Sequence, residues 1–327
     1  MPVTNFPGGA SSYGIPLVGQ GTVYDMPWGA TWFVNNRTGI VNGDGTNRDR
    51  PMVSLADALA RASAYDTIYV GPGHAENVTA SNTFSGAVTG GPNTGAQTIP
   101  QGVRIIGEGS GTNRPTFTLT AVASTFALAA ANSSIENVRI LSPQTGSTTT
   151  TTMVTVTAAG CAVRSCQFQG SASATALVTT GISLSSAAND FQATDNTGFT
   201  VTGTPTAWLA TTGTAAAARV QILRNTIRWL MSGVAVPVVD FTSGSGTAPA
   251  DWVIADNCLS NLTAASTVVI KGVASATGHI VFNYLETVAG TAAAVAITTP
   301  GGMVMYQNFV AQGGKQAIAI TTGGNSS

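Results

Sequence analysis

The fold is decided by a segment that recurs in the second half of the chain: residues 192–199 read QATDNTGF, residues 221–227 read QILRNTI, and residues 253–259 read VIADNCL. Each copy is a short apolar stretch that reaches an asparagine and then resumes with another apolar residue. With four weaker copies, the anchor residues are Asn137, Cys166, Asn196, Asn225, Asn257, Asn283 and Asn308. They recur at intervals of about 25 to 32 residues, which is typical of a solenoid whose coils tolerate small loop insertions.

The stretches between the anchors favour strands and turns. Residues 148–160 read TTTTTMVTVTAAG and residues 266–273 read STVVIKGV, with many β-branched residues and no helical periodicity. Only 8% of the residues are charged. A polar but uncharged sequence can still build a core, because Thr, Ser and Asn of one coil pair with their own kind in the next. The sequence therefore predicts an all-β protein, a parallel β-helix.

Charge and composition exclude several functional classes. The net charge is −1, and the 13 basic residues are scattered, so we expect no binding to nucleic acid. The first residues have no pattern of a secretory signal, and no stretch approaches the roughly 18 apolar residues of a membrane span. We therefore expect synthesis in a cytoplasm and no membrane partner. The odd number of cysteines, 3, argues against a disulfide framework, and we expect buried structural thiols with no metal and no cofactor.

Three regions follow from the pattern. Residues 1–36 have no clear period and are predicted to be an N-terminal arm that contacts a partner or another copy. Residues 37–100 are predicted to hold the first coils and a short capping helix, because Ser54 and Asp57 form a capping pair ahead of an amphipathic stretch. A helix laid across the first coil covers its exposed core and unpaired backbone groups. Residues 101–327 are predicted to be β-helix coils.

The N-terminal part of the sequence resembles a known family. The run of Gly43–Thr46, Arg50-Pro51, Ser54–Leu59 and Asp66–Gly73 resembles the first coil of pectate-lyase-like right-handed β-helix proteins. With the opening residues 4–9 and 13–18, it resembles tailed-phage β-helix proteins of the virion. The resemblance implies a right-handed solenoid, usually homotrimeric, attached to a capsid or tail.

Charged residues at the repeat suggest ladders rather than a catalytic centre. Asp195 and Asp256 precede their anchors, and the coil between them has Arg224 at the same position. A second column reads Asp190, Arg219 and Asp251. Successive coils are roughly 4.8 Å apart, so opposite charges would face each other and penalise a slipped register. The alternative is that Asp195 and Asp256, ~10 Å apart, act as an inverting pair on a glycosidic bond. The arginine between them argues against a general acid, because it favours the ionised carboxylate.

The remaining candidates are weaker. His74 and His279 are the only histidines, far apart in sequence, and we expect them on the surface or in turns. Trp229 and Trp252 are possible platforms for stacking a sugar, although the repeat position of Trp252 favours the core.

Taken together, we expect a structural, non-enzymatic virion protein that decorates or stabilises a phage capsid, or forms a head-attached spike. Its expected partners are the major capsid protein and two further copies in a homotrimer, and its expected location is the capsid surface. The alternative is a tail-associated spike that binds or depolymerises a host-surface polysaccharide. The expected capsid contacts are aromatic residues of the arm: Phe6, Tyr13, Tyr24 and Trp28. The expected structural ladder consists of residues of the repeat: Asn196, Asn225, Asn257, Asp195, Arg224 and Asp256.

Overall fold

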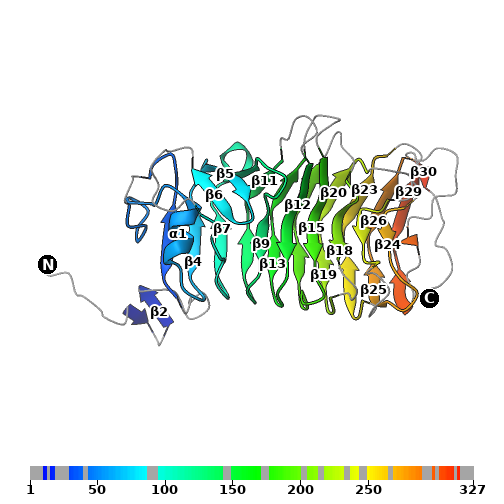
Figure 1. The fold of residues 1–327 in the computed structure, drawn as a ribbon. Helices are drawn as coiled ribbons and strands as arrows, with labels where there is room; N and C mark the ends of the chain where they lie inside the picture. The colour runs from blue at the N-terminus through cyan, green and yellow to red at the C-terminus, as the bar shows by residue number, and fades with distance from the viewer. Residues whose placement is uncertain are drawn as a thin grey trace.

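The protein is a rod of stacked coils in a computed structural model (Figure 1). The structure describes residues 10–12, 15–18, 29–39, 43–86, 95–142, 149–170, 177–199, 205–212, 217–231, 236–242, 249–263, 268–288, 297–298, 302–312 and 315–316. In these residues the strands form three long sheets of parallel coils and one small antiparallel sheet, β1 (Ala10–Ser12) with β2 (Ile15–Val18). The predicted all-β parallel solenoid is confirmed.

The ten-stranded sheet is parallel throughout. Its strands are β3 (Thr31–Val34), β4 (Thr67–Val70), β7 (Arg104–Gly107), β10 (Ser134–Glu136), β13 (Ala162–Arg164), β16 (Gln192–Thr194), β19 (Gln221–Leu223), β22 (Trp252–Ala255), β25 (Thr277–Val281) and β28 (Gly302–Tyr306).

The eleven-stranded sheet is parallel except at its two ends, where β5 pairs with β6 and β29 pairs with β30 in antiparallel fashion. Its strands are β5 (Ala75–Ala80), β6 (Thr83–Gly86), β8 (Thr116–Leu119), β11 (Arg139–Leu141), β14 (Gln167–Gln169), β17 (Thr197–Phe199), β20 (Thr226–Trp229), β23 (Cys258–Asn261), β26 (Tyr284–Thr287), β29 (Phe309–Gln312) and β30 (Lys315–Gln316).

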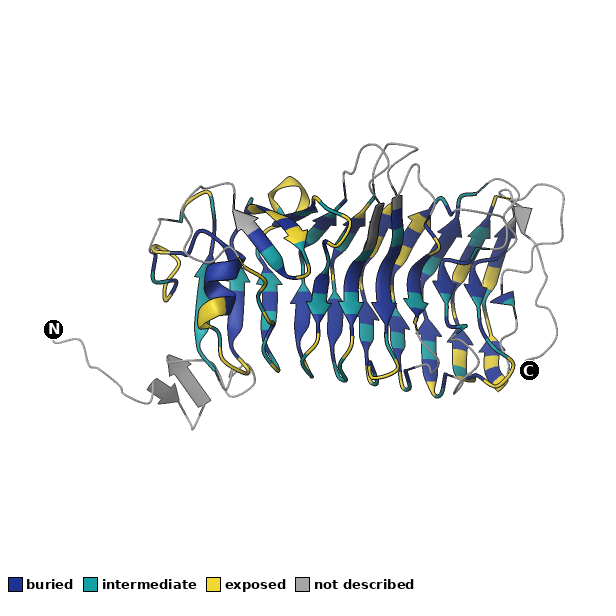
Figure 2. Cartoon of the chain, viewed as in Figure 1, coloured by how far each residue is buried: buried dark blue, intermediate teal, exposed yellow. Residues whose placement is uncertain are grey.

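The seven-stranded sheet closes the cross-section of the rod. Its strands are β9 (Phe126–Leu128), β12 (Thr149–Val156), β15 (Leu177–Leu184), β18 (Ala207–Thr211), β21 (Val239–Asp240), β24 (Ile270–Lys271) and β27 (Ile297–Thr298). Each strand pairs with the equivalent strand one coil away, so identical positions form straight columns along the rod. Figure 2 shows buried positions through the rod and exposed positions gathered at the bends.

The short helix lies at the N-terminal end of the rod (Figure 1). Helix α1 (Leu55–Arg61) begins after Ser54, whose side chain accepts a hydrogen bond from Asp57 N–H at 3.1 Å. Leu55, Ala58 and Leu59 are buried in the core, as the predicted amphipathic pattern requires. A short 3₁₀ turn, Gly111–Asn113, follows in the next coil.

The rod begins earlier than the predicted boundary. β3 lies within the 1–36 segment that the sequence assigns to the arm, yet it pairs in register with β4. Asp66 holds the segment around β3 against the next coil, because its carboxylate accepts hydrogen bonds from Ala30 N–H at 2.6 Å and from Trp32 Nε1–H at 2.8 Å. The segment lacks the repeat because its register is set by these contacts rather than by an asparagine anchor.

Two residues singled out in the sequence lie deeper than a surface site requires. His74 closes the turn that begins at Gly71, one of the two expected locations, but it is buried. Its Nδ1 accepts a hydrogen bond from Asn36 N–H, so its proton lies on Nε2 and is donated to Glu76 at 3.0 Å. Trp229 is fully buried and offers no platform to a sugar, whereas Trp252 is in the core as its repeat position predicted.

Candidate functional site

The bend between the ten-stranded and eleven-stranded sheets is held by an internal asparagine ladder. Asn196 Nδ2 donates to Asn225 Oδ1 at 2.9 Å, and Asn225 Nδ2 donates to Asn257 Oδ1 at 2.9 Å. The ladder continues through Asn283 to Asn308 with the same geometry. Each Oδ1 also accepts the backbone N–H of the asparagine one coil before it, at 2.9 Å for the Asn196 N–H. The three central asparagines are buried and satisfied, so their role is to fix the bend.

The residue before each asparagine of this ladder has a left-handed backbone and points outward. φ is +58° at Asp195, +54° at Arg224, +57° at Asp256, +57° at Phe282 and +51° at Gln307. Asn137, the first predicted anchor, is itself the left-handed residue of its coil (φ +53°), because Glu136 pairs with Arg164 and Asn137 thus lies one position before the column of Cys166. A left-handed conformation is easy for glycine, asparagine and aspartate, and unfavourable for bulky side chains. The side chains of this column therefore determine the surface chemistry of the bend. The free-energy cost of the left-handed backbone depends on which residue occupies the position.

In the middle of the rod this column is ionic. Arg224 donates to both carboxylate oxygens of Asp195, at 2.8 and 2.9 Å, and these hydrogen bonds raise the pKa of the guanidinium. Asp256, one coil further on, adds a weaker electrostatic attraction. The pair is about half exposed, so it contributes little to stability and serves to fix the register.

The second predicted column lies at the bend on the other edge of the ten-stranded sheet. Arg219 forms a bidentate pair with Asp190, at 2.6 and 2.8 Å. The Arg219 guanidinium holds the pKa of the Asp190 carboxyl below its ordinary value. Asp251 occupies the same position one coil further along and attracts Arg219 at longer range. Each arginine therefore forms its bidentate ion pair with the aspartate of the preceding coil and not with the aspartate of the following coil.

Carboxylates are dispersed over the described part of the rod. Glu136 lies between Arg104 and Arg164, at 3.3 and 3.4 Å. Within the described ranges, no three His, Cys, Asp or Glu side chains are close enough to hold a metal ion. In the same ranges, no helix is long and apolar enough to cross a membrane.

The last described coils change this surface from ionic to aromatic. Four side chains around the ladder are exposed: Phe282 by 48%, Tyr284 by 38%, Tyr306 by 37% and Phe309 by 43%. Tyr284 and Phe309 face each other on β26 and β29 with ring centroids 5.2 Å apart and planes 12° apart. Phe282 and Tyr306 meet edge to face, also at 5.2 Å. We call these four residues the aromatic bend.

For a phenylalanine, Phe282 is unusual in both its backbone conformation and the exposure of its ring. It occupies the same bend position as Asp256 in the coil before it, because the preceding residues, Val281 and Ala255, are paired in register. It combines a left-handed backbone with a half-exposed phenyl ring. Strain of this kind costs on the order of 1–3 kcal/mol. Every coil from Ser165 to Gln307 has the same left-handed bend, so what distinguishes Phe282 is its bulky, half-exposed ring. The aromatic bend is therefore the surface on which binding is best supported.

The aromatic bend was missed in the sequence, although a signal existed. The segments IVFNYL (280–285) and VMYQNFV (304–310) were used only to locate anchors. Once Asn283 and Asn308 are aligned with Asn257, the residues on either side of each anchor fall on outward positions. The predicted arm contacts Phe6, Tyr13, Tyr24 and Trp28 lie outside the described residues.

The cysteines are free, as expected. Cys161 and Cys166 are buried, and Cys258 is partly exposed. Cys166 begins the ladder: its backbone N–H donates to Asn196 Oδ1 at 2.9 Å, and its thiol points to the Ile135 carbonyl at 3.5 Å. Burial raises the pKa of this thiol to about 12, so it is a structural group.

No protein-family model and no curated protein matches this sequence. Two solved structures share the fold. A rhamnogalacturonan lyase has a TM-score of 0.44 and 11% identity, covering 84% of this chain and 75% of that one. A GH136 lacto-N-biosidase from Eubacterium ramulus has a TM-score of 0.37 and 11% identity, covering 86% and 68%.

This likeness is one of β-helix fold alone. Both proteins are enzymes by name, and this finding contradicts the prediction that the chain is not an enzyme, which is withdrawn. Neither is named as a virion component, so the phage part of the family resemblance gains no support from them.

Proposed function

We propose that this protein binds a polysaccharide on the outside of the rod, at the aromatic bend. The single observation that supports the proposal is the cluster of four exposed rings around Asn283 and Asn308, one of them on a strained backbone. Aromatic rings offer large apolar surfaces with little loss of conformational entropy, which suits the C–H faces of sugar rings.

The surroundings of the rings favour a glycan over an apolar partner. Gln307 is exposed beside Tyr306 and presents an amide that can both donate to and accept from a hydroxyl group. Glu286 lies one outward position beyond Tyr284 and accepts a hydrogen bond from Ser260 Oγ at 2.7 Å. Rings with a few polar groups placed among them are typical of sites that orient a hydroxylated ligand.

The geometry of the rod also suits a repeating ligand. Equivalent side chains follow one another at roughly 4.8 Å, the coil spacing, so a linear chain lying along the rod meets similar contacts at each step. Tyr284 and Phe309 are one such step apart. A globular protein partner has no corresponding period.

Binding is tested with a panel of immobilised neutral and acidic polysaccharides. We expect at least one to bind, and the double change Tyr284→Ala with Phe309→Ala to weaken its affinity at least tenfold, because truncating an aromatic anchor commonly removes about 1 kcal/mol or more. The matched control is Phe199→Ala, which removes an equally exposed ring from the same sheet three coils away. Equal losses in the control and in the double variant would refute the site.

The same samples test for cleavage. Release of reducing ends or unsaturated sugars from the bound polysaccharide would make the protein a depolymerase. Loss of that cleavage in Asp195→Asn or Asp256→Asn would then assign these two aspartates a role in the reaction. Attachment to a phage capsid or tail, the major capsid protein as partner, the homotrimer and the virion location stay predictions.

A further inference from the structure

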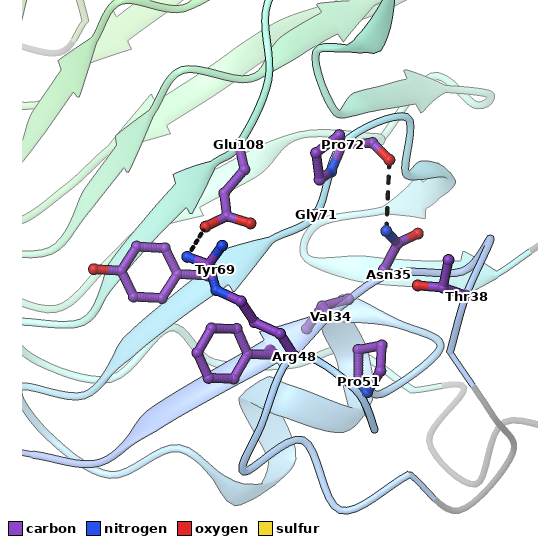
Figure 3. Close-up of a pocket in the computed structure, with 10 residues that line it drawn as sticks. Val34, Asn35, Thr38, Arg48, Pro51, Tyr69, Gly71, Pro72 and Glu108 are labelled. Atoms are coloured by element: carbon purple, nitrogen blue, oxygen red, sulfur yellow. Dashed lines mark hydrogen bonds and ion pairs between the residues drawn. The ribbon is translucent and has the colours of Figure 1, made fainter.

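A second surface feature lies at the opposite end of the rod. Next to the first two strands of the ten-stranded sheet is a recess of about 170 Å³ (Figure 3). It is lined by aromatic, proline and polar residues: Phe33, Val34, Asn35, Thr38, Arg48, Pro51, Tyr69, Gly71, Pro72 and Glu108. Phe33 and Tyr69 share a register column with Tyr306 of the aromatic bend, about 40 Å away over nine coil steps, although several positions between them are buried.

The recess is built by contacts that hold its walls in place. The rings of Phe33 and Tyr69 are stacked with centroids 5.7 Å apart, and the Arg48 guanidinium lies 5.4 Å from the centre of the Phe33 ring. Arg48 is fixed there by an ion pair with Glu108. On the other side in Figure 3 stand Asn35 and Thr38. Gly71 makes room for the Asn35 side chain, because a Cβ there would lie 2.6 Å from Asn35 Nδ2.

The size of the recess suits a small ring. An engineered cavity of about 150 Å³ in another protein accommodates benzene. A space of about 170 Å³ therefore has room for one six-membered ring with its substituents pointing outward. The recess is open to solvent on one side, so a longer saccharide can extend out of it.

The polar groups select a neutral, hydroxylated ring. Arg48 and Glu108 cancel each other's charge, which disfavours a free cation or anion. Together they offer both donors and acceptors, and Thr38 adds a hydroxyl. Asn35 Nδ2 makes only a long hydrogen bond of 3.5 Å to the Pro72 carbonyl. A proline or phenyl ring would offer these groups no hydrogen bond, whereas sugar hydroxyls can both donate to them and accept from them.

We propose that this recess is a second saccharide site that takes a single neutral pyranose unit, which lies against the Phe33 and Tyr69 side chains beside the Arg48 guanidinium that contacts both rings. The inference extends the proposed glycan role to the other end of the rod. Two sites about 40 Å apart on one rod would let a single long polysaccharide strand engage both, so that the second contact forms at a high effective concentration.

The test uses ligand-observed NMR on the full chain with methyl glucoside, methyl galactoside, methyl mannoside and methyl N-acetylglucosaminide, and with acetate, methylammonium and N-acetylproline amide as probes of other chemistries. We expect at least one neutral glycoside to bind. The change Thr38→Trp, which fills the recess from an exposed position, should weaken that binding at least tenfold. The control Arg37→Trp places the same side chain at the neighbouring exposed residue, which does not line the recess, and should leave binding unchanged.

The outcomes separate this inference from the proposed function. Glycoside binding that survives Tyr284→Ala with Phe309→Ala but is lost in Thr38→Trp supports the recess even if the aromatic bend proves inert. Binding of acetate, methylammonium or the proline amide in place of the glycosides would overturn the assignment. So would equal binding by Thr38→Trp and Arg37→Trp. Because Thr38→Trp could disturb the loop, Glu108→Gln provides a nearly isosteric second variant, for which at least a threefold loss is expected.

Discussion

The asparagine ladder makes a quantitative prediction for Asn225→Ala. Asn225 Oδ1 accepts the Asn196 N–H at 2.9 Å, and its Nδ2 donates to the Ala193 carbonyl at 2.9 Å. The alanine leaves both buried backbone groups without these partners, at about 1–3 kcal/mol each, whereas Asn257 Oδ1 keeps its bond from the backbone N–H of residue 225. The expected loss is about 4 kcal/mol of local stability.

The effect should be local, because each coil contacts only its neighbours. Hydrogen exchange followed by mass spectrometry should show peptides covering 192–227 exchanging roughly 1,000-fold faster, while peptides near the capping helix are unchanged. The control Thr226→Ala alters the exposed neighbour and should change stability by less than about 0.5 kcal/mol. If both variants exchange alike, side-chain amides do not hold the bend, and the repeat is maintained by the strands alone.

Three further outcomes are expected. Phe282→Asn should raise the midpoint of thermal unfolding by relieving about 1 kcal/mol of backbone strain, while polysaccharide binding falls; a lower midpoint would contradict the strain argument. The pair of Asp190 with Arg219 should contribute stability above the ordinary pKa of aspartate and lose it as the pH falls through the depressed pKa of Asp190, and a ¹³C carboxyl titration should show that pKa rise in Arg219→Ala. Iodoacetamide at pH 8 should label the partly exposed Cys258 first in the native protein and reach Cys166 only after unfolding, as peptide mapping would show; native labelling of Cys166 would contradict its burial.

The repeat was predictable because it rests on local chemistry. An asparagine at a tight bend needs its amide paired one coil away, so the spacing of Asn196 and Asn225 in sequence reports their stacking in space. The charge columns followed from the same register. What the register did not give was the choice of partner: Arg224 forms its bidentate pair with Asp195 and not with Asp256, a matter of side-chain geometry within one bend.

The recess near the first coil could not be predicted in this way. Its walls come from β3, from the loop that contains Arg48 and from Glu108 after β7, which are brought together by contacts without any period. Residues 45 and 52 bind the edge of β3 through the backbone of Phe33, at 2.8 Å in each case. The burial of His74 was missed for a related reason, since it depends on Glu76 and on the Asn36 N–H from the turn after β3.

The rod thus separates two tasks along one bend. The anchor is an asparagine in every coil from Asn196 to Asn308, and replacing it leaves backbone groups unpaired. The left-handed residue before it points to solvent, and it is free to change from Asp195 to Arg224 and then to Phe282 without disturbing the interior. Ionic side chains there lock the register of coils that would otherwise slip. The exposed ring of Phe282 forms no ion pair with a neighbouring coil, and its backbone is strained. Its presence is therefore best explained by binding of the proposed polysaccharide.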